Sequence, residues 1–204
     1  MTVLIPFAGL SPVPWKNGGG STIEVAIGPP DAGFEDFEWR VSLATIEKDG
    51  AFSLFPGVDR TLALVEGHGM TLDIDGEPTM VTDLEPVVTF DGASSVMAKL
   101  SRGPSTDFNV MTRSERCYHT FGRRRLSGDS TFVARAEVTV LFLAEGDALE
   151  LRSEQERIGL VRFDAVVLEP GSVWKLEAGQ GMIYIADIWY HEDQEDEGDE
   201  ASYE

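Results

Sequence analysis

The chain has 204 residues, which suits one large domain or two small ones and is long enough to bury a substantial core. Its 36 acidic residues outnumber 16 basic ones and give a formal net charge of -20, which argues against nucleic acid as a partner. The single cysteine, Cys117, cannot form an intramolecular disulfide, and with no basic leader or long apolar run we expect a cytoplasmic protein without membrane contact.

Apolar residues that alternate with polar ones predict strands along most of the chain. The alternation is clear at 22–27 and 37–44, and it has the period of two that half-buried strands require. Turn sequences such as Pro56-Gly57 and Pro170-Gly171 separate the runs. Further short apolar runs follow at 61–65, 87–90, 108–111, 139–143, 166–168 and 182–188. Many short strands and no long amphipathic helix predict an all-β sandwich or barrel.

An internal repeat indicates that the fold contains two similar halves. Eight residues recur without a gap at a spacing of 79: Leu62, Leu64, Glu66, Gly67, Leu72, Val87, Val88 and Gly92 match Leu141, Leu143, Glu145, Gly146, Leu151, Val166, Val167 and Gly171. Two strand-rich modules in tandem predict a double-stranded β-helix, or jelly roll, of the cupin type, repeated as a bicupin.

The expected modules differ in their content. Residues 1–125 form the predicted first cupin-like module, with a ligand pocket, and residues 126–190 form the second. Five arginines between 113 and 125 are interpreted as a solvated connection between the modules. Residues 191–204 carry eight carboxylates and no Lys or Arg, which predicts a disordered acidic tail.

Metal and nucleophile signatures are missing. The three histidines, His68, His119 and His191, form no pair at ligand spacing, so we expect neither a metal nor another cofactor. No G-x-S-x-G motif occurs, and we do not expect a catalytic dyad between Cys117 and His119. We therefore interpret the thiol of Cys117 as chemically unused.

A run of three glycines follows Lys16 and Asn17. A phosphate-binding Walker loop has its lysine after the glycines and a helix next, whereas here the lysine comes first and a strand follows. The glycines allow either a flexible turn or a close approach of the backbone to a ligand or to another segment. The neighbouring Trp15 and Lys16 favour a ligand site over a flexible turn.

Two predicted strands carry polar residues that could share a pocket. Arg40 and Ser42 lie on the polar face of one strand, and Asp107 and Asn109 lie on one face of another. An arginine suits a carboxylate, and an asparagine suits an amide or formyl group, so the set predicts a pocket for a small acidic, amide-bearing molecule. An ion pair between Arg40 and Asp107 on an outer sheet face is the alternative.

Three longer strings resemble the HutD/Ves family of bacteria, which is often associated with histidine utilisation. They are PWKNGGGSTIEV at 14–25, WRVSLATIEKDGAFSLFPGVDRTLALVEG at 39–67 and GPSTDFNVMTR at 103–113. The resemblance implies a metal-free bicupin with a small-molecule-binding or regulatory role. Carried over motif by motif, it implies a ligand site formed by Lys16, Asn17, Arg40, Ser42, Arg60, Asp107 and Asn109.

The favoured function is binding rather than catalysis. We expect the first module to hold a small carboxylate or amide metabolite, for instance N-formylglutamate or urocanate, in a regulatory or accessory protein of histidine utilisation. One alternative is a metal-independent isomerase or hydrolase in which Asp107 or Glu24 is the general base and Lys16 or Arg40 stabilises negative charge. The other is a protein-binding scaffold. The sequence does not decide between a monomer and a homodimer.

Overall fold

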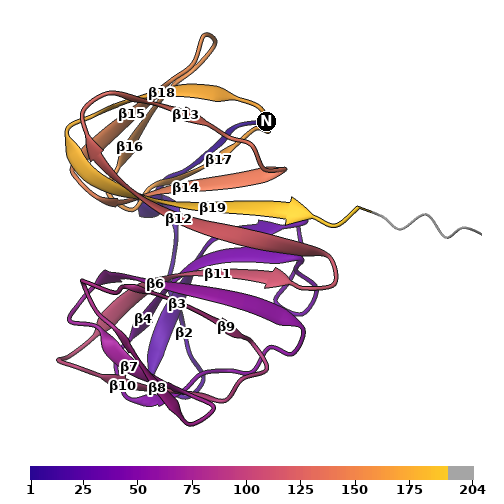
Figure 1. Ribbon diagram of the computed structural model, residues 1–204, viewed down its shortest axis with the longest axis vertical. Helices are drawn as coiled ribbons and strands as arrows, with labels where there is room; N and C mark the ends of the chain where they lie inside the picture. The colour runs from indigo at the N-terminus through magenta and orange to yellow at the C-terminus, as the bar shows by residue number, and fades with distance from the viewer. Residues whose placement is uncertain (193–204) are drawn as a thin grey trace, which may run out of the picture.

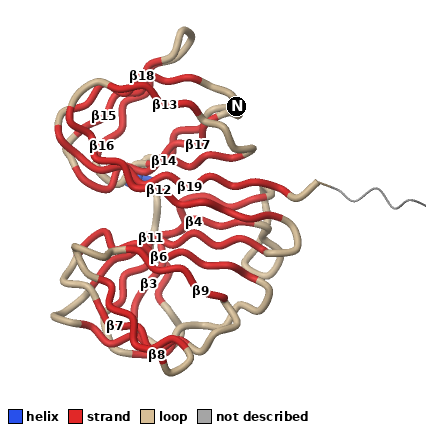
Figure 2. The backbone as a smooth tube through the Cα atoms, in the orientation of Figure 1, coloured by secondary structure: helices blue, strands red, loops and turns tan. Residues whose placement is uncertain are grey.

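The structure, a computed structural model, describes residues 1–192 of the chain. Within that range it contains nineteen β-strands and one 3-10 helix, η1 (Phe7–Gly9), so the predicted all-β fold is confirmed (Figure 2). No helix of this range has the length and hydropathy needed to cross a membrane. Apart from His191 and Glu192, the predicted acidic tail at 191–204 lies outside the described residues.

The first module consists of two antiparallel sheets, drawn in the lower half of Figure 1. The larger sheet has six strands in the order β2-β3-β4-β11-β6-β9, and the smaller has four in the order β5-β10-β7-β8. The strands are β2 (Val13–Pro14), β3 (Gly20–Gly28), β4 (Trp39–Ile46), β5 (Gly50–Ala51), β6 (Val58–Glu66), β7 (Met70–Ile74), β8 (Glu77–Val81), β9 (Val87–Asp91), β10 (Val96–Leu100) and β11 (Ser105–Arg113).

The second module has the same construction and forms the upper half of Figure 1. Its sheets have five strands in the order β1-β17-β14-β19-β12 and four in the order β13-β18-β15-β16. The strands are β1 (Val3–Ile5), β12 (Cys117–Ser127), β13 (Ser130–Val133), β14 (Val138–Glu145), β15 (Ala148–Arg152), β16 (Arg157–Val161), β17 (Ala165–Leu168), β18 (Val173–Ala178) and β19 (Gln180–Tyr190).

The strand order repeats as a duplication requires. The order β4-β11-β6-β9 of the first module corresponds to β12-β19-β14-β17 of the second, and β5-β10-β7-β8 corresponds to β13-β18-β15-β16. Leu62 on β6 and Leu141 on β14, which match at the spacing of 79, lie on equivalent strands. Each half therefore builds the same pair of sheets from the same succession of strands.

The modules do not divide the chain after residue 125. β12 is an eleven-residue strand that pairs with β19 along its whole length, so residues 117–125 of the segment interpreted as a connection belong to the second module, whereas Arg113 ends β11 of the first. Cys117 and Phe121 of β12 pack in or against the core between the modules. β1 also pairs with the second module, with Val3 beside Val167. The chain therefore passes from the first to the second module between β11 and β12.

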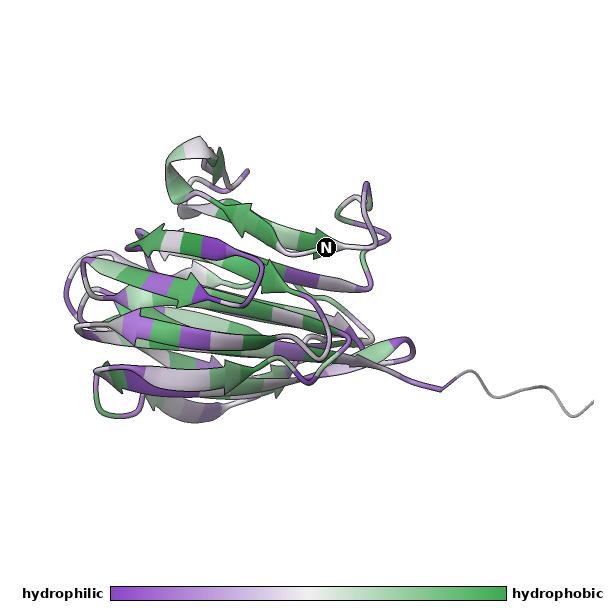
Figure 3. Ribbon diagram, turned by 90° about the horizontal axis from the view of Figure 1, so that it is seen from above, coloured by the Kyte–Doolittle hydropathy of each residue, from purple (hydrophilic) through white to green (hydrophobic). Residues whose placement is uncertain are grey.

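The larger sheets of the two modules pack against each other. Figure 3 shows hydrophobic residues along most strands, with hydrophilic residues between them on several. Phe108 of β11 is fully buried between the modules, with its ring 4.9 Å from that of Phe142 and 5.9 Å from that of Tyr184. The opposite face of each large sheet covers the interior of its own module, where a separate apolar cluster lies.

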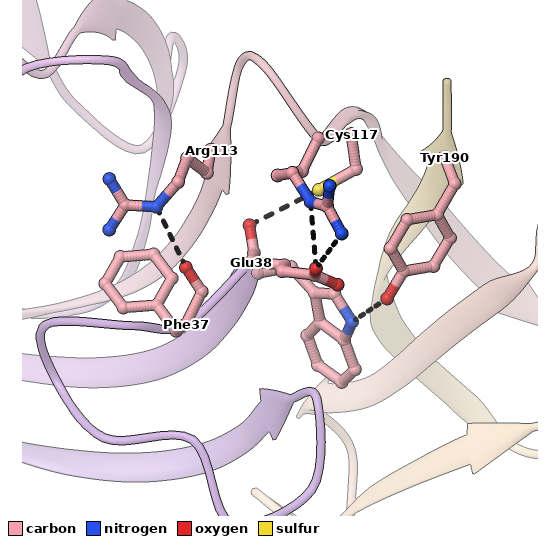
Figure 4. Close-up of polar contacts among 7 residues, drawn as sticks. Phe37, Glu38, Arg113, Cys117 and Tyr190 are labelled. Atoms are coloured by element: carbon pink, nitrogen blue, oxygen red, sulfur yellow. Dashed lines mark hydrogen bonds and ion pairs between the residues drawn. The ribbon is translucent and has the colours of Figure 1, made fainter. Parts of the chain in front are cut away.

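Polar contacts around Cys117 also tie the modules together (Figure 4). Its Sγ donates to the carbonyl of Glu38 over 3.3 Å, and the carboxylate of Glu38 lies 3.0 Å from Nη2 of Arg116. Nearby, Trp39 Nε1 donates to Tyr190 Oη over 3.1 Å. Burial, together with the carboxylate of Glu38, raises the pKa of Cys117 to about 11. The thiol is therefore protonated at neutral pH and poorly suited to act as a nucleophile.

Candidate ligand-binding site

The first module contains a cavity of about 730 Å³, a volume suited to a small metabolite. It is lined by the larger sheet, by β5 and the residues after it, and by the loop between β2 and β3. The structure brings together around it all seven residues that the sequence singled out: Lys16, Asn17, Arg40, Ser42, Arg60, Asp107 and Asn109. That they bind a ligand stays a prediction.

Three neighbouring strands carry five of these residues. Arg40 and Arg60 lie in one row across β4, β11 and β6, and Ser42 and Asn109 lie in the next row. Asp107 follows Asn109 on the same face, because side chains two residues apart on a strand point to the same side. The residues between them on β4 and β11 point the other way, into the core between the modules.

Arg60, Asn109 and Asp107 form a buried chain of polar contacts. Their exposed fractions are 7%, 4% and 0%. Arg60 Nη2 donates to Asn109 Oδ1 over 3.1 Å, and Asn109 Nδ2 donates to Asp107 Oδ1. Arg60 Nε and Asp107 Oδ2 have no hydrogen-bond partner in the described part of the chain. Leaving a buried polar group unpaired costs about 1–3 kcal/mol, so a partner for either atom would stabilise this arrangement.

Burial shifts the pKa values of Asp107 and Arg60. It raises the pKa of Asp107 to about 8, although Arg60 and the hydrogen bond from Asn109 favour the carboxylate. It lowers the pKa of Arg60 to about 10, an effect that Asp107 opposes and Arg40 reinforces. At neutral pH Arg60 is therefore charged while the carboxyl group of Asp107 is mostly protonated, which leaves this part of the cavity cationic.

Aromatic rings enclose the guanidinium of Arg60. Its Cζ lies 5.0 Å from the ring centroid of Phe90 and 5.4 Å from those of Phe52 and Phe55. These contacts favour the cation and limit the directions in which it can turn. The sequence arguments missed the rings, because phenylalanines near turns resemble ordinary core residues. Their one signal was the position of Phe52 and Phe55 inside the second of the three family-like strings.

Arg40 has a different partner from the one considered in the ion-pair alternative. Its Nε donates to Glu24 Oε2 over 2.9 Å, and its Cζ lies 5.6 Å from the ring centroid of the half-exposed Phe34. Asp107 instead accepts from Asn109. The alternative of an Arg40–Asp107 ion pair on an outer sheet face is therefore wrong: the two side chains line the cavity and have separate partners.

The glycine run positions the rim of the cavity. A Cβ on Gly20 would lie 2.1 Å from the carbonyl oxygen of Thr45, so only glycine allows β3 to approach β4 at this point. Asn17 Oδ1 accepts from the backbone of Gly19 over 2.9 Å and so stabilises the turn. Lys16 and Asn17 are exposed and line the cavity from this loop. The close approach is thus made to another strand of the protein.

The second module lacks the polar set. The register of the paired strands shows which positions of the two modules are equivalent. Arg60 on β6 pairs with Met111 on β11, and the equivalent residue Thr139 on β14 pairs with Asp187 on β19. By this criterion Arg40, Ser42, Arg60, Asp107 and Asn109 correspond to Thr120, Gly122, Thr139, Ile183 and Ile185. Ile183 and Ile185 pack in or against the module's own apolar cluster. Among the described residues, the buried Arg-Asn-Asp chain is thus a feature of the first module.

The histidines do not converge on this cavity. His119 forms hydrogen bonds through both ring nitrogens, with Thr112 at 2.7 Å and Thr61 at 2.8 Å, and burial lowers its pKa. His68 is exposed in the turn between β6 and β7, and His191 follows β19. In residues 1–192 no group of three or more His, Cys, Asp or Glu side chains could hold a metal ion.

Sequence comparisons identify relatives over most of the chain. The family model of HutD matches residues 8–185. An uncharacterized 21.2 kDa protein in the hutC 3′ region of Pseudomonas putida is 35% identical over 162 residues, which is 77% of this chain and 81% of that protein. Protein Ves of Citrobacter koseri is 41% identical over 121 residues, which is 54% of this chain and 62% of that protein.

Solved structures agree with these matches. A conserved protein of unknown function from Pseudomonas aeruginosa superposes with a TM-score of 0.85 and 27% identity over 93% of this chain and 99% of that one. HutD from Pseudomonas fluorescens superposes with a TM-score of 0.78 and 27% identity, over 94% of this chain and 100% of that one. Salicylate 1,2-dioxygenase from Pseudoaminobacter salicylatoxidans superposes with a TM-score of 0.61 over 92% of this chain and 82% of that one. At 10% sequence identity, this likeness shows a shared fold alone. Because the family match spans nearly all of both modules, the chain belongs to the HutD family.

Proposed function

We propose that the first module binds a small metabolite with a carboxylate or amide group, such as N-formylglutamate or urocanate, and that the protein has a regulatory or accessory role in histidine utilisation. One observation carries the proposal: Arg60 Nε and Asp107 Oδ2 are buried at the cavity without a partner among the described residues. Buried polar atoms in folded proteins are nearly always paired, so this arrangement favours a ligand that supplies the missing contacts.

The charges around the cavity favour an anionic ligand. A carboxylate can accept a charge-assisted hydrogen bond from the guanidinium of Arg60, which is stronger than a hydrogen bond between neutral groups. Arg40 and Lys16 add positive charge, of which Glu24 offsets part through its contact with Arg40. Asn109, which can donate and accept, lies in the same row as Ser42 and suits an amide or formyl group.

The relatives support the metabolic part of the proposal. One is named for its position in the hutC 3′ region of Pseudomonas putida, and a similar structure is that of HutD from Pseudomonas fluorescens. A binding protein whose occupancy follows the level of a pathway intermediate would serve a regulatory or accessory role there without turnover.

The test is ligand binding by isothermal titration calorimetry and thermal shift. N-formyl-L-glutamate and urocanate are compared with glutaramide, which lacks carboxylates, on the natural chain and on Arg60→Met. Loss of a hydrogen bond to a charged group costs about 1.5–3 kcal/mol, so we expect the substitution to weaken carboxylate binding about 10- to 150-fold. Arg162→Met is the matched control, because Arg162 is half-exposed and pairs with Glu66 instead.

Two results would refute the binding proposal. The first is that neither carboxylate changes the melting temperature or gives heat of binding. The second is that each carboxylate binds Arg60→Met as tightly as it binds the natural chain. A ligand that binds the protein without affinity for the unfolded chain must raise the melting temperature, so a silent thermal shift at high ligand concentration is informative.

A second function has one observation in its favour, the pKa of Asp107 near 8. A carboxyl group that titrates near neutral pH can transfer protons in a general acid–base reaction, as expected of a metal-independent isomerase or hydrolase. EDTA-treated protein is incubated with each pathway intermediate and the mixture is analysed by NMR. Turnover that Asp107→Asn abolishes would favour the enzyme, and unchanged intermediates that still bind would favour the binding protein.

A further inference from the structure

The carboxyl group of Asp107 has a hydrogen bond on only one of its two oxygens. Oδ1 accepts from Asn109 Nδ2, whereas Oδ2 has no partner in residues 1–192, and the side chain is 0% exposed. An ionised carboxylate presents two strong acceptors, and burying one of them unpaired is costly. A protonated carboxyl group instead needs one acceptor for its O–H. The surroundings therefore suit the acid form, with the hydrogen on Oδ2.

The charged groups that face Asp107 do not remove this preference. Arg60 approaches from β6, but its Nη2 hydrogen bond goes to Asn109 rather than to Asp107. Arg40 on β4 is engaged by Glu24 of β3, and Lys16 lies in the exposed loop between β2 and β3. The effect of burial exceeds that of Arg60 and of the hydrogen bond from Asn109, so the pKa stays near 8.

Resting on the proposed function, we infer that Asp107 binds the ligand carboxylate as a hydrogen-bond donor, with Oδ2–H and Arg60 Nε–H both directed at the ligand and the proton kept on Asp107 in the complex. These are the two buried atoms of the cavity chain that the described residues leave unpaired. An ionised Asp107 would repel a carboxylate in a site that excludes water, whereas the acid form attracts it. Asp107 thus selects carboxylates over ligands that present an ammonium group.

A hydrogen-bond donor at Asp107 makes ligand binding weaken as the pH rises. Below pH 7 Asp107 already holds its proton, so carboxylate affinity is constant. Above pH 8 the free protein has lost that proton, and each binding event takes one proton from solution. Affinity then falls by up to about tenfold for each further pH unit, by linkage between proton and ligand.

Calorimetry with N-formyl-L-glutamate at pH 6, 7, 8 and 9 tests this, because the carboxylates of that ligand are ionised throughout. Each titration is repeated in two buffers of different ionisation enthalpy, which gives the number of protons taken up. The natural chain should show constant affinity from pH 6 to 7, a fall above pH 8 and uptake of nearly one proton at pH 9. Asp107→Asn cannot ionise, so its affinity should not change between pH 6 and pH 9 and its binding should take up no proton at pH 9, whatever the affinity is at pH 7.

Asp83→Asn is the control, because Asp83 is exposed in the loop between β8 and β9 and should leave the pH profile unchanged. A flat profile for the natural chain, or a slope that persists in Asp107→Asn, would overturn the inference. If neither N-formylglutamate nor urocanate binds either protein, the proposed function fails on its own. Carbon-13 NMR of the ligand-free carboxyl groups then decides for Asp107: a midpoint near pH 8 supports the acid form, and one below pH 6 overturns it.

Discussion

Replacing Asp107 with asparagine should change how the stability of the fold depends on pH. The folded-state pKa of Asp107 is raised from 3.8 to about 8 by burial. A raised folded pKa makes the unfolded chain release the proton first, so this contribution to stability is complete below pH 4 and is lost as the pH rises to 8. Each unit of pKa corresponds to about 1.4 kcal/mol, which gives a loss of about 5 kcal/mol over that range.

Urea denaturation at pH 5, 6, 7 and 8 measures the effect on both proteins. Asparagine has the same shape and does not ionise, so the contributions of all other groups cancel in the difference between the two stability curves. We expect the free energy of unfolding of Asp107→Asn, relative to that of the natural chain, to increase by about 1.4 kcal/mol for each pH unit up to pH 8. Parallel curves would show that Asp107 ionises in the folded state as easily as in the unfolded chain, and would refute the electrostatic account of the cavity.

Three other substitutions test the fold and the cavity. Phe108→Ala should cost about 3–5 kcal/mol in urea denaturation, because the ring is fully buried between the modules, and a loss below about 1 kcal/mol would contradict that packing. Gly20→Ala should lower the melting temperature and shift the NMR signals of β3 and β4, because its Cβ would meet the carbonyl oxygen of Thr45 at 2.1 Å; unchanged spectra would oppose this. Glu24→Gln should change the free energy of unfolding by no more than about 1 kcal/mol, since the ion pair between Arg40 and Glu24 is partly exposed. Calorimetry should show that the variant binds carboxylates more tightly, because Arg40 is no longer paired with Glu24, and weaker binding would argue against a role for Arg40.

The alternation of side chains predicted the content of the cavity well. It assigned Arg40 and Ser42 to one face of a strand and Asp107 and Asn109 to one face of another, and the structure places all four on the same side of neighbouring strands. Period two fixes which side chains share a face. It leaves open whether that face meets solvent or a cavity, and so the ion-pair alternative could not be excluded from these residues alone.

The repeat predicted the duplication but not the fate of the site in the second half. The spacing is 79 for Leu62 and Leu141, whereas the partner strands place Asn109 opposite Leu62 and Ile185 opposite Leu141, a spacing of 76. A comparison at one fixed spacing therefore misaligns β11 with β19. Only the strand register shows that isoleucine replaces the polar residue.

The boundary between the modules could not be found from local sequence. β1 joins β17 and β12 joins β19, and both pairings link segments far apart along the chain. The arginines at 123–125 suggested a solvated connection, and Arg123 and Arg125 are indeed exposed, but they belong to β12, which pairs with β19 along its whole length. Long-range pairing outweighs local composition in such edge strands.

The most direct test of the central claim is a crystal structure of the chain grown with N-formyl-L-glutamate. The account predicts the ligand inside the cavity of the first module, with a carboxylate oxygen within hydrogen-bond distance of both Arg60 Nε and Asp107 Oδ2. A ligand bound elsewhere on the chain, or one inside the cavity that leaves both atoms without a partner, would contradict it.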